Sequence, residues 1–223
     1  MPKAVWERSL DINMELTLYT NDMAKYLEAD SIVDFRHERI VQLAEELAGQ
    51  AENKTDYIRA AYEYVRDRIS HSADIGHEVI TCSASEVLLA GHGICFAKSH
   101  LLAALLRVKG IPAGFCYQKL ILDDETAPIL ICHGLNGVYI EEHDKWIRLD
   151  ARGNKAGVNA CFSIESEQLA FPVRPQAGEQ DIFVVYPEPD KKVLEKLQAH
   201  TSRSELWIDL PTELEYKGLA YDE

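Results

Sequence analysis

The chain has 223 residues, and 23 Lys and Arg against 37 Asp and Glu give it a formal net charge of −14. Hydrophobic residues make up 47% and charged residues 27%, so the chain can fill a sizeable core and is not expected to be disordered. Phosphate backbones and anionic membranes attract clustered Lys and Arg, which this acidic sequence lacks. We therefore expect neither nucleic acid nor a membrane among its partners.

The cysteines are five in number, irregularly spaced and without a Cys-x-x-Cys pair: Cys82, Cys95, Cys116, Cys132 and Cys161. This pattern fits neither a secreted disulfide framework nor a zinc ribbon. Charged residues interrupt the segment from Met1 to Thr20, so no secretion signal is expected there, and no apolar run approaches the roughly 20 residues that cross a bilayer. These features predict a reduced, cytoplasmic protein with room for a working thiol.

Three helices are predicted in the first half of the chain. Apolar residues at helical spacing indicate the first two: Ile40, Leu43, Ala44 and Leu47, with Asp34 as a candidate cap, then Ile58, Ala61, Tyr62, Val65 and Ile69, with Asn53 or Thr55 as the cap. The third, from 96 to 109, has a leucine-rich surface wider than one stripe, which is typical of a buried helix. It ends at Gly110 and Pro112, a helix stop signal, and Cys95 lies at its first turn.

Four strands and a last helix follow. The strands are predicted at 113–121, within 128–140, at 146–150 and at 181–186, and the helix at about 191–200. Helices first and an antiparallel sheet afterwards predict an α+β fold. We expect one domain over 1–223, with a core at about 35–155 and a C-terminal extension at 156–223.

Cys95 becomes a candidate nucleophile through this placement. A thiolate at a helix N-terminus is stabilised by the unpaired N–H groups, which also point at whatever the sulfur attacks. A lone cysteine beside a leucine-rich helix is more often a small core residue. Whether Cys95 is catalytic therefore depends on which side chains lie next to it.

The second and third strands supply such partners. If they pair with Tyr139 opposite Trp146, four apolar residues share one face, which fixes the register: Val138, Ile140, Ile147 and Leu149. The other face then carries His133 on one strand, diagonal to Asp150 on the other. A nucleophilic thiol needs an imidazole to take and return its proton and a carboxylate to orient that ring.

Three motifs in this order resemble those of the transglutaminase-like superfamily of papain-type enzymes. They are Gly93-Ile94-Cys95 with the helix up to Gly110-Ile111-Pro112-Ala113, then His133 to Ile140, then Trp146 to Asp150. The resemblance covers about residues 55–155. It implies a papain-like, transglutaminase-core fold, with Cys95 as nucleophile, His133 as base and then acid, and Asp150 as the orienting carboxylate.

Two positions depart from the family pattern. The histidine motif commonly has an aromatic residue two positions after the histidine, and here Leu135 stands there. Papain-like enzymes also use a polar side chain upstream of the cysteine in the oxyanion hole, yet no Gln lies between Gln50 and Gln118. His77, Thr81 and Ser83 are conceivable substitutes, and only the backbone N–H of Cys95 can be assigned as a donor.

Metal sites are weaker interpretations of the same residues. His92, Cys95 and His100 suggest zinc, but no second tight pair completes a tetrahedral set. The acidic residues Asp123, Asp124, Glu141, Glu142 and Asp144 suggest calcium, but their spacing fits no loop motif. We expect no metal and no cofactor.

The sequence therefore predicts a cysteine enzyme that attacks an amide or acyl carbon of a peptide or amide substrate through a thioester on Cys95. Water as the second substrate gives a peptidase or amidase, which the short chain favours over a protein-glutamine transglutaminase with its accessory domains. A catalytically idle relative that binds a peptide or partner in the same cleft is the alternative from another class.

Overall fold

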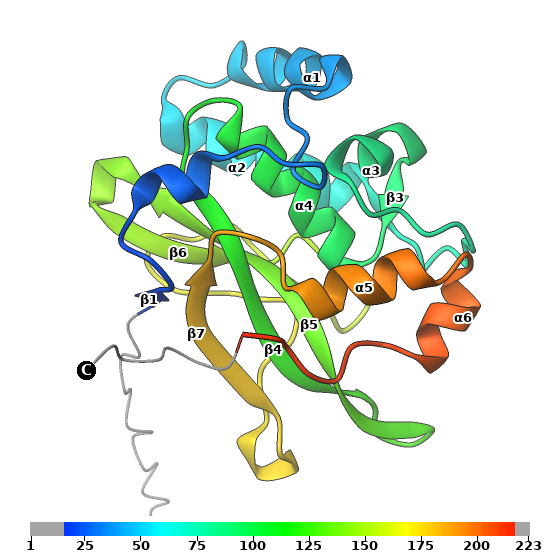
Figure 1. Cartoon of the computed structure of the whole chain (residues 1–223). Helices are drawn as coiled ribbons and strands as arrows, with labels where there is room; N and C mark the ends of the chain where they lie inside the picture. The colour runs from blue at the N-terminus through cyan, green and yellow to red at the C-terminus, as the bar shows by residue number, and fades with distance from the viewer. Residues whose placement is uncertain (1–15, 217–223) are drawn as a thin grey trace, which may run out of the picture.

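The computed structural model describes residues 16–216 and places helices around a curled, mixed sheet (Figure 1), which confirms the α+β class. The sheet order is β1-β7-β4-β5-β6. The strands are β1 (Thr17–Leu18), β4 (Ala113–Asp123), β5 (Ala127–Ile140), β6 (Lys145–Leu149) and β7 (Gln180–Tyr186). All neighbours are antiparallel except β1, which pairs parallel with β7. The predicted antiparallel sheet thus gains a short parallel edge strand.

The two amphipathic helices are confirmed as α1 (Glu38–Ala48) and α2 (Lys54–Arg68). Asn53 caps α2 by accepting from the backbone N–H of Asp56. The cap predicted for α1 is wrong, because His37 caps that helix, whereas the Asp34 carboxylate accepts from the backbone N–H of Ser85.

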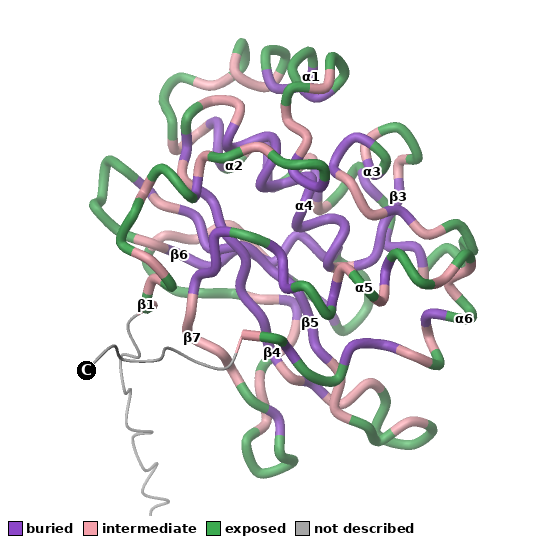
Figure 2. The backbone as a smooth tube through the Cα atoms, viewed as in Figure 1, coloured by how far each residue is buried: buried purple, intermediate pink, exposed green. Residues whose placement is uncertain are grey.

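The leucine-rich helix is α4 (Cys95–Arg107), and burial of almost its whole surface confirms the prediction (Figure 2). It packs between α1, α2 and α3 (Ala84–Ala90) on one side and β4 and β5 on the other. Gly110 follows it with φ +70°, as a helix stop requires. Two short strands, β2 (Ser70–His71) and β3 (His92–Gly93), pair parallel just before α4.

The residues after 155 continue the same structure. The strand β7 lies between β1 and β4 in the sheet, and α5 (Lys191–Ala199) and α6 (Arg203–Ile208) follow it. Short 3₁₀ turns occupy Met23–Leu27, Glu141–His143 and Pro175–Ala177. Within 16–216 no helix has the length and apolarity to cross a bilayer. Most of the segment judged for a secretion signal, residues 1–15, lies outside the described part.

Candidate active site

Cys95 is the first residue of α4, and no side chain caps that helix start within the described residues. The strand β3 leads directly into it through Ile94, so the backbone fixes the position of the sulfur. The first N–H groups of a helix have no partner inside the helix and carry a partial positive charge. The thiol of Cys95 is half-buried and opens into a cavity.

The β5–β6 hairpin has the predicted register, with Val138 opposite Ile147 and Tyr139 opposite Trp146. The four apolar residues of one face lie in the main core, as expected: Val138, Ile140, Ile147 and Leu149. The ladder ends at the pair Asn136 and Leu149, so Asp150 lies just beyond it. Beyond that pair, β5 has no partner residue in β6, so this edge of β5 is open to the start of α4.

His133 and Asp150 meet at this free edge. The His133 Nε2 lies 2.8 Å from the Asp150 Oδ2, and the two residues are only 4% and 1% exposed. The same carboxylate accepts backbone N–H bonds from Arg152 and Ala170, at 3.0 and 3.1 Å. With Nε2–H donated to the carboxylate, the neutral ring keeps Nδ1 as its acceptor.

His133 and Asp150 stabilise each other's charged forms. Burial alone would lower the pKa of His133, but the Asp150 carboxylate and the Cys95 sulfur raise it well above its ordinary value. Burial would raise the pKa of Asp150, whereas the charge and hydrogen bond of His133 and the two backbone N–H groups hold it below its ordinary value. The arrangement therefore favours an imidazolium next to a carboxylate.

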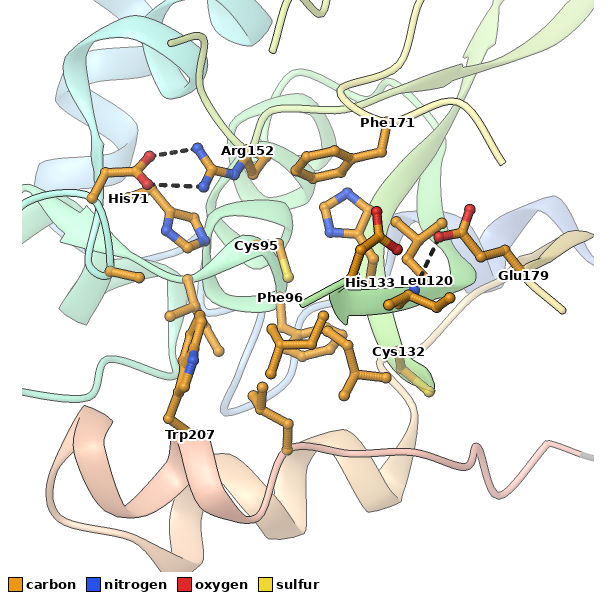
Figure 3. A pocket seen from close by; sticks show the side chains of 18 of the residues that line it. His71, Cys95, Phe96, Leu120, Cys132, His133, Arg152, Phe171, Glu179 and Trp207 are labelled. Carbon is orange, nitrogen blue, oxygen red and sulfur yellow. Dashed lines mark hydrogen bonds and ion pairs between the residues drawn. The ribbon is translucent and has the colours of Figure 1, made fainter. Parts of the chain in front are cut away.

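A cavity of about 530 Å³ joins these groups (Figure 3). Cys95 and His133 lie in its wall together with His71 and Phe171. Apolar side chains from β4, β5 and the C-terminal part also line the cavity: Leu120, Ile121, Leu122, Ile131, Trp207 and Leu210. The rim is charged, because Arg152 and Lys155 both bind Asp74, while Arg174 binds Asp124 and Glu179.

The segment around Phe171, which is turn-rich in sequence, covers the histidine. The Phe171 ring meets the His133 ring edge to face, with centroids 5.4 Å apart. Neither this contact nor the Ala170 bond to Asp150 has a signal in the sequence, since both arise from an irregular loop. Residues after 155 thus complete the surroundings of the candidate triad.

Of the remaining cysteines, Cys132 also borders the cavity, whereas Cys82, Cys116 and Cys161 are not among its lining residues. Cys116 and Cys132 are fully buried, and burial raises the pKa of each thiol to about 12. Cys82 is half-buried, and burial raises its pKa to about 11. Cys161 is half-buried, with its thiol near the Asn159 side-chain oxygen.

The three substitutes considered for the oxyanion hole are occupied or distant. Thr81 donates to the backbone oxygen of His92, and Ser83 caps α3. His77 is exposed, stacks on the His92 ring and does not line the cavity.

The residues considered for metals are bonded in other ways. The rings of His92 and His100 bond to the Ser72 hydroxyl and the Cys82 backbone oxygen. Among the acidic residues, Glu141 pairs with Lys54, and Asp123 accepts from Thr126. Across 16–216, no three His, Cys, Asp or Glu side chains are grouped to hold a metal ion.

Comparison with known families identifies one match. The model of the "Transglutaminase-like superfamily" matches residues 41–151, a range that contains all three candidate residues. No curated protein sequence matches the chain.

Several solved structures are similar at low identity. A candidate cysteine protease from Cytophaga hutchinsonii is 22% identical with a TM-score of 0.49, over 60% of this chain and 43% of that one. The periplasmic domain of TgpA from Pseudomonas aeruginosa is 17% identical with a TM-score of 0.44, over 58% and 46%. A candidate protease from Parabacteroides distasonis is 16% identical with a TM-score of 0.40, over 68% and 32%. The matched part is less than half of each of these chains.

Proposed function

Because this chain belongs to the transglutaminase-like superfamily, we propose that it is a cysteine peptidase or amidase that works through a thioester on Cys95. The observation that carries the proposal is the buried 2.8 Å bond between His133 and Asp150 in the wall of the cavity that holds the Cys95 thiol. A carboxylate that fixes the ring leaves the second ring nitrogen for the thiol, as nucleophilic catalysis requires.

In the first half-reaction, the Cys95 proton passes to Nδ1 of His133 and the sulfur bonds to the amide carbon. The carbonyl oxygen becomes an oxyanion near the backbone N–H groups at the start of α4. The C–N bond then breaks as the imidazolium gives its proton to the leaving amine. Asp150 supports the imidazolium throughout by its charge and its hydrogen bond.

In the second half-reaction, water attacks the thioester carbon and gives a proton to His133. The C–S bond breaks, the acid product leaves, and the proton returns to sulfur. A charged rim around the cavity supports water as the acceptor, because Lys155 and Arg174 keep 48% and 38% of their side chains exposed.

Alkylation with iodoacetamide at pH 6 to 7 tests the nucleophile. We expect Cys95 to react at least tenfold faster than the other four cysteines, and this excess to disappear in His133→Ala. Peptide mass spectrometry assigns each site, and the half-buried Cys161 is the matched internal control. Equal rates at Cys95 and Cys161 would overturn the catalytic proposal and favour a cleft that only binds a peptide.

Amide substrates supplied with and without a primary amine test the second half-reaction. We expect free acid as the main product in both cases. Amide exchange without acid release would contradict hydrolysis and would identify a transglutaminase.

A further inference from the structure

His71 is a buried histidine in the wall of the same cavity. It ends β2 and pairs with Gly93 of β3, two residues before Cys95. Its residue surface is 8% exposed, and its Nδ1 is buried without a hydrogen-bond partner among the described residues. A buried polar atom without a partner costs free energy, so an unpaired ring nitrogen beside a cavity calls for an explanation.

His71 and His133 lie on opposite sides of the Cys95 sulfur (Figure 3). They are close enough that the charge on His133 affects His71. Attack by the sulfur needs a base on one side and hydrogen-bond donors for the oxyanion on another. Two imidazoles on opposite sides of the sulfur can fill these two roles.

The surroundings give the two rings different protonation states. Burial and, after it, the nearby Arg152 guanidinium lower the pKa of His71 to about 3. The carboxylate nearest in sequence, Asp74, is bound by Arg152 and Lys155 and does not hydrogen-bond to the ring. His71 therefore stays neutral where His133 is charged. Two titratable groups of one site whose pKa values are moved apart in this way can take different roles in the reaction.

We propose that His71 is the side-chain donor of the oxyanion hole, acting with the backbone N–H of Cys95 on the carbonyl oxygen under attack. This inference rests on the proposed thioester chemistry. A neutral imidazole has one N–H to donate, so it can stabilise the oxyanion without competing with His133 for the thiol proton. His71 would then be the side-chain donor of the oxyanion hole that could not be assigned from the sequence.

Two reactions of the same sulfur separate this role from a structural one. Acylation by p-nitrophenyl acetate passes through an oxyanion, whereas alkylation by iodoacetamide displaces iodide and does not. In His71→Leu we expect the acylation rate to fall about 10²- to 10³-fold and the alkylation rate of Cys95 to stay within about threefold. His71→Gln keeps an N–H donor and should recover at least part of the acylation rate.

His77→Leu is the matched control, because His77 is an exposed histidine six residues away that does not line the cavity. It should keep both rates. If acylation in His71→Leu equals that of the unmodified chain, or if both rates fall together, the assignment of His71 is wrong. If the unmodified chain shows neither fast alkylation nor acylation of Cys95, the proposed function itself fails, and the assignment fails with it.

Discussion

His133 owes its charge first to the Asp150 carboxylate, with the Cys95 sulfur contributing as well. The Asp150 carboxylate is buried, hydrogen-bonded to Nε2 at 2.8 Å and held in place by two backbone N–H groups. Its negative charge offsets the burial that would otherwise keep the ring neutral. The functional behaviour of the imidazole is therefore a property of this pair.

Asp150→Asn should show this dependence. The amide keeps the size of the side chain but removes the charge, so we expect the pKa of His133 to fall and acyl turnover to drop about 10²- to 10⁴-fold. NMR titration of the imidazole and a pH profile of turnover measure the two effects. Asp144→Asn, at an exposed carboxylate that accepts from Tyr139, is the control and should change neither. An unaltered His133 titration in Asp150→Asn would contradict the argument.

Lys98 lies one turn after Cys95 and is completely buried. Its Nζ donates to the backbone oxygens of Arg66 and Ile69, at the end of α2, instead of to a carboxylate. Burial and, after it, the charge of Arg152 lower the pKa of Lys98 to about 7.

This lysine should make stability depend on pH. An unfolded lysine ionises near pH 10.4, so between about pH 7 and 10 the unfolded chain binds more protons than the folded one. The free energy of unfolding then rises with pH, by at most about 1.4 kcal/mol per unit from this group. Urea unfolding of the wild type and Lys98→Met at pH 7, 8 and 9 measures the difference, which should grow in favour of the wild type. Parallel pH profiles would contradict the prediction.

At the scale of elements, the close approach of α4 to β5 depends on a glycine. A Cβ built at Gly134 would lie 2.5 Å from Cδ1 of Phe96, the second residue of α4. Gly134 follows His133 directly, so this contact sets the spacing between the strand that carries the histidine and the helix that begins with Cys95.

Gly134→Ala should force the two elements apart. We expect a loss of about 1–3 kcal/mol in the free energy of unfolding, as for other overpacked cores, and a fall in acyl turnover of about 10²-fold from the misplaced sulfur. Gly49→Ala is the control, because its Cβ would meet no atom closer than 3.4 Å and its φ is −65°. Urea unfolding and turnover assays on both variants measure the effects, and a Gly134→Ala protein as stable and active as Gly49→Ala would refute this role.

The elements also differ in how far the sequence predicts them. Long periodic segments such as α2, α4 and the β5–β6 hairpin are predicted well, because apolar spacing and register reflect which face is buried. The strands β2 and β3 have two residues each, too few for any alternation, and they carry His71 to the site. The cover over His133 comes from a loop around Phe171, whose position depends on tertiary contacts alone.

At the scale of the whole molecule, one buried side chain of β6 links two segments of the C-terminal part. Arg148 of β6 hydrogen-bonds to Glu167 in the loop, at 2.6 and 2.7 Å, and to Asp181 of β7. Its guanidinium also lies 4.5 Å from the centre of the Phe183 ring. The side chain of Arg148 is 1% exposed, so these contacts are shielded from solvent.

Arg148→Met should loosen this connection. Methionine can fill the space but leaves Glu167 and Asp181 without their cation, and removing one partner of a buried ion pair is strongly destabilising. Since the two carboxylates keep 39% and 18% of their side-chain exposure, we expect a smaller loss, about 1–3 kcal/mol. The loop that covers His133 should become sensitive to proteases between residues 156 and 181, and acyl turnover should fall about tenfold or more.

Lys109→Met, at an exposed ion pair with Glu45, is the control and should change stability by less than about 1 kcal/mol. Limited proteolysis, urea unfolding and turnover assays measure these effects, and a variant with normal turnover but a cleaved loop would separate the cover from the chemistry.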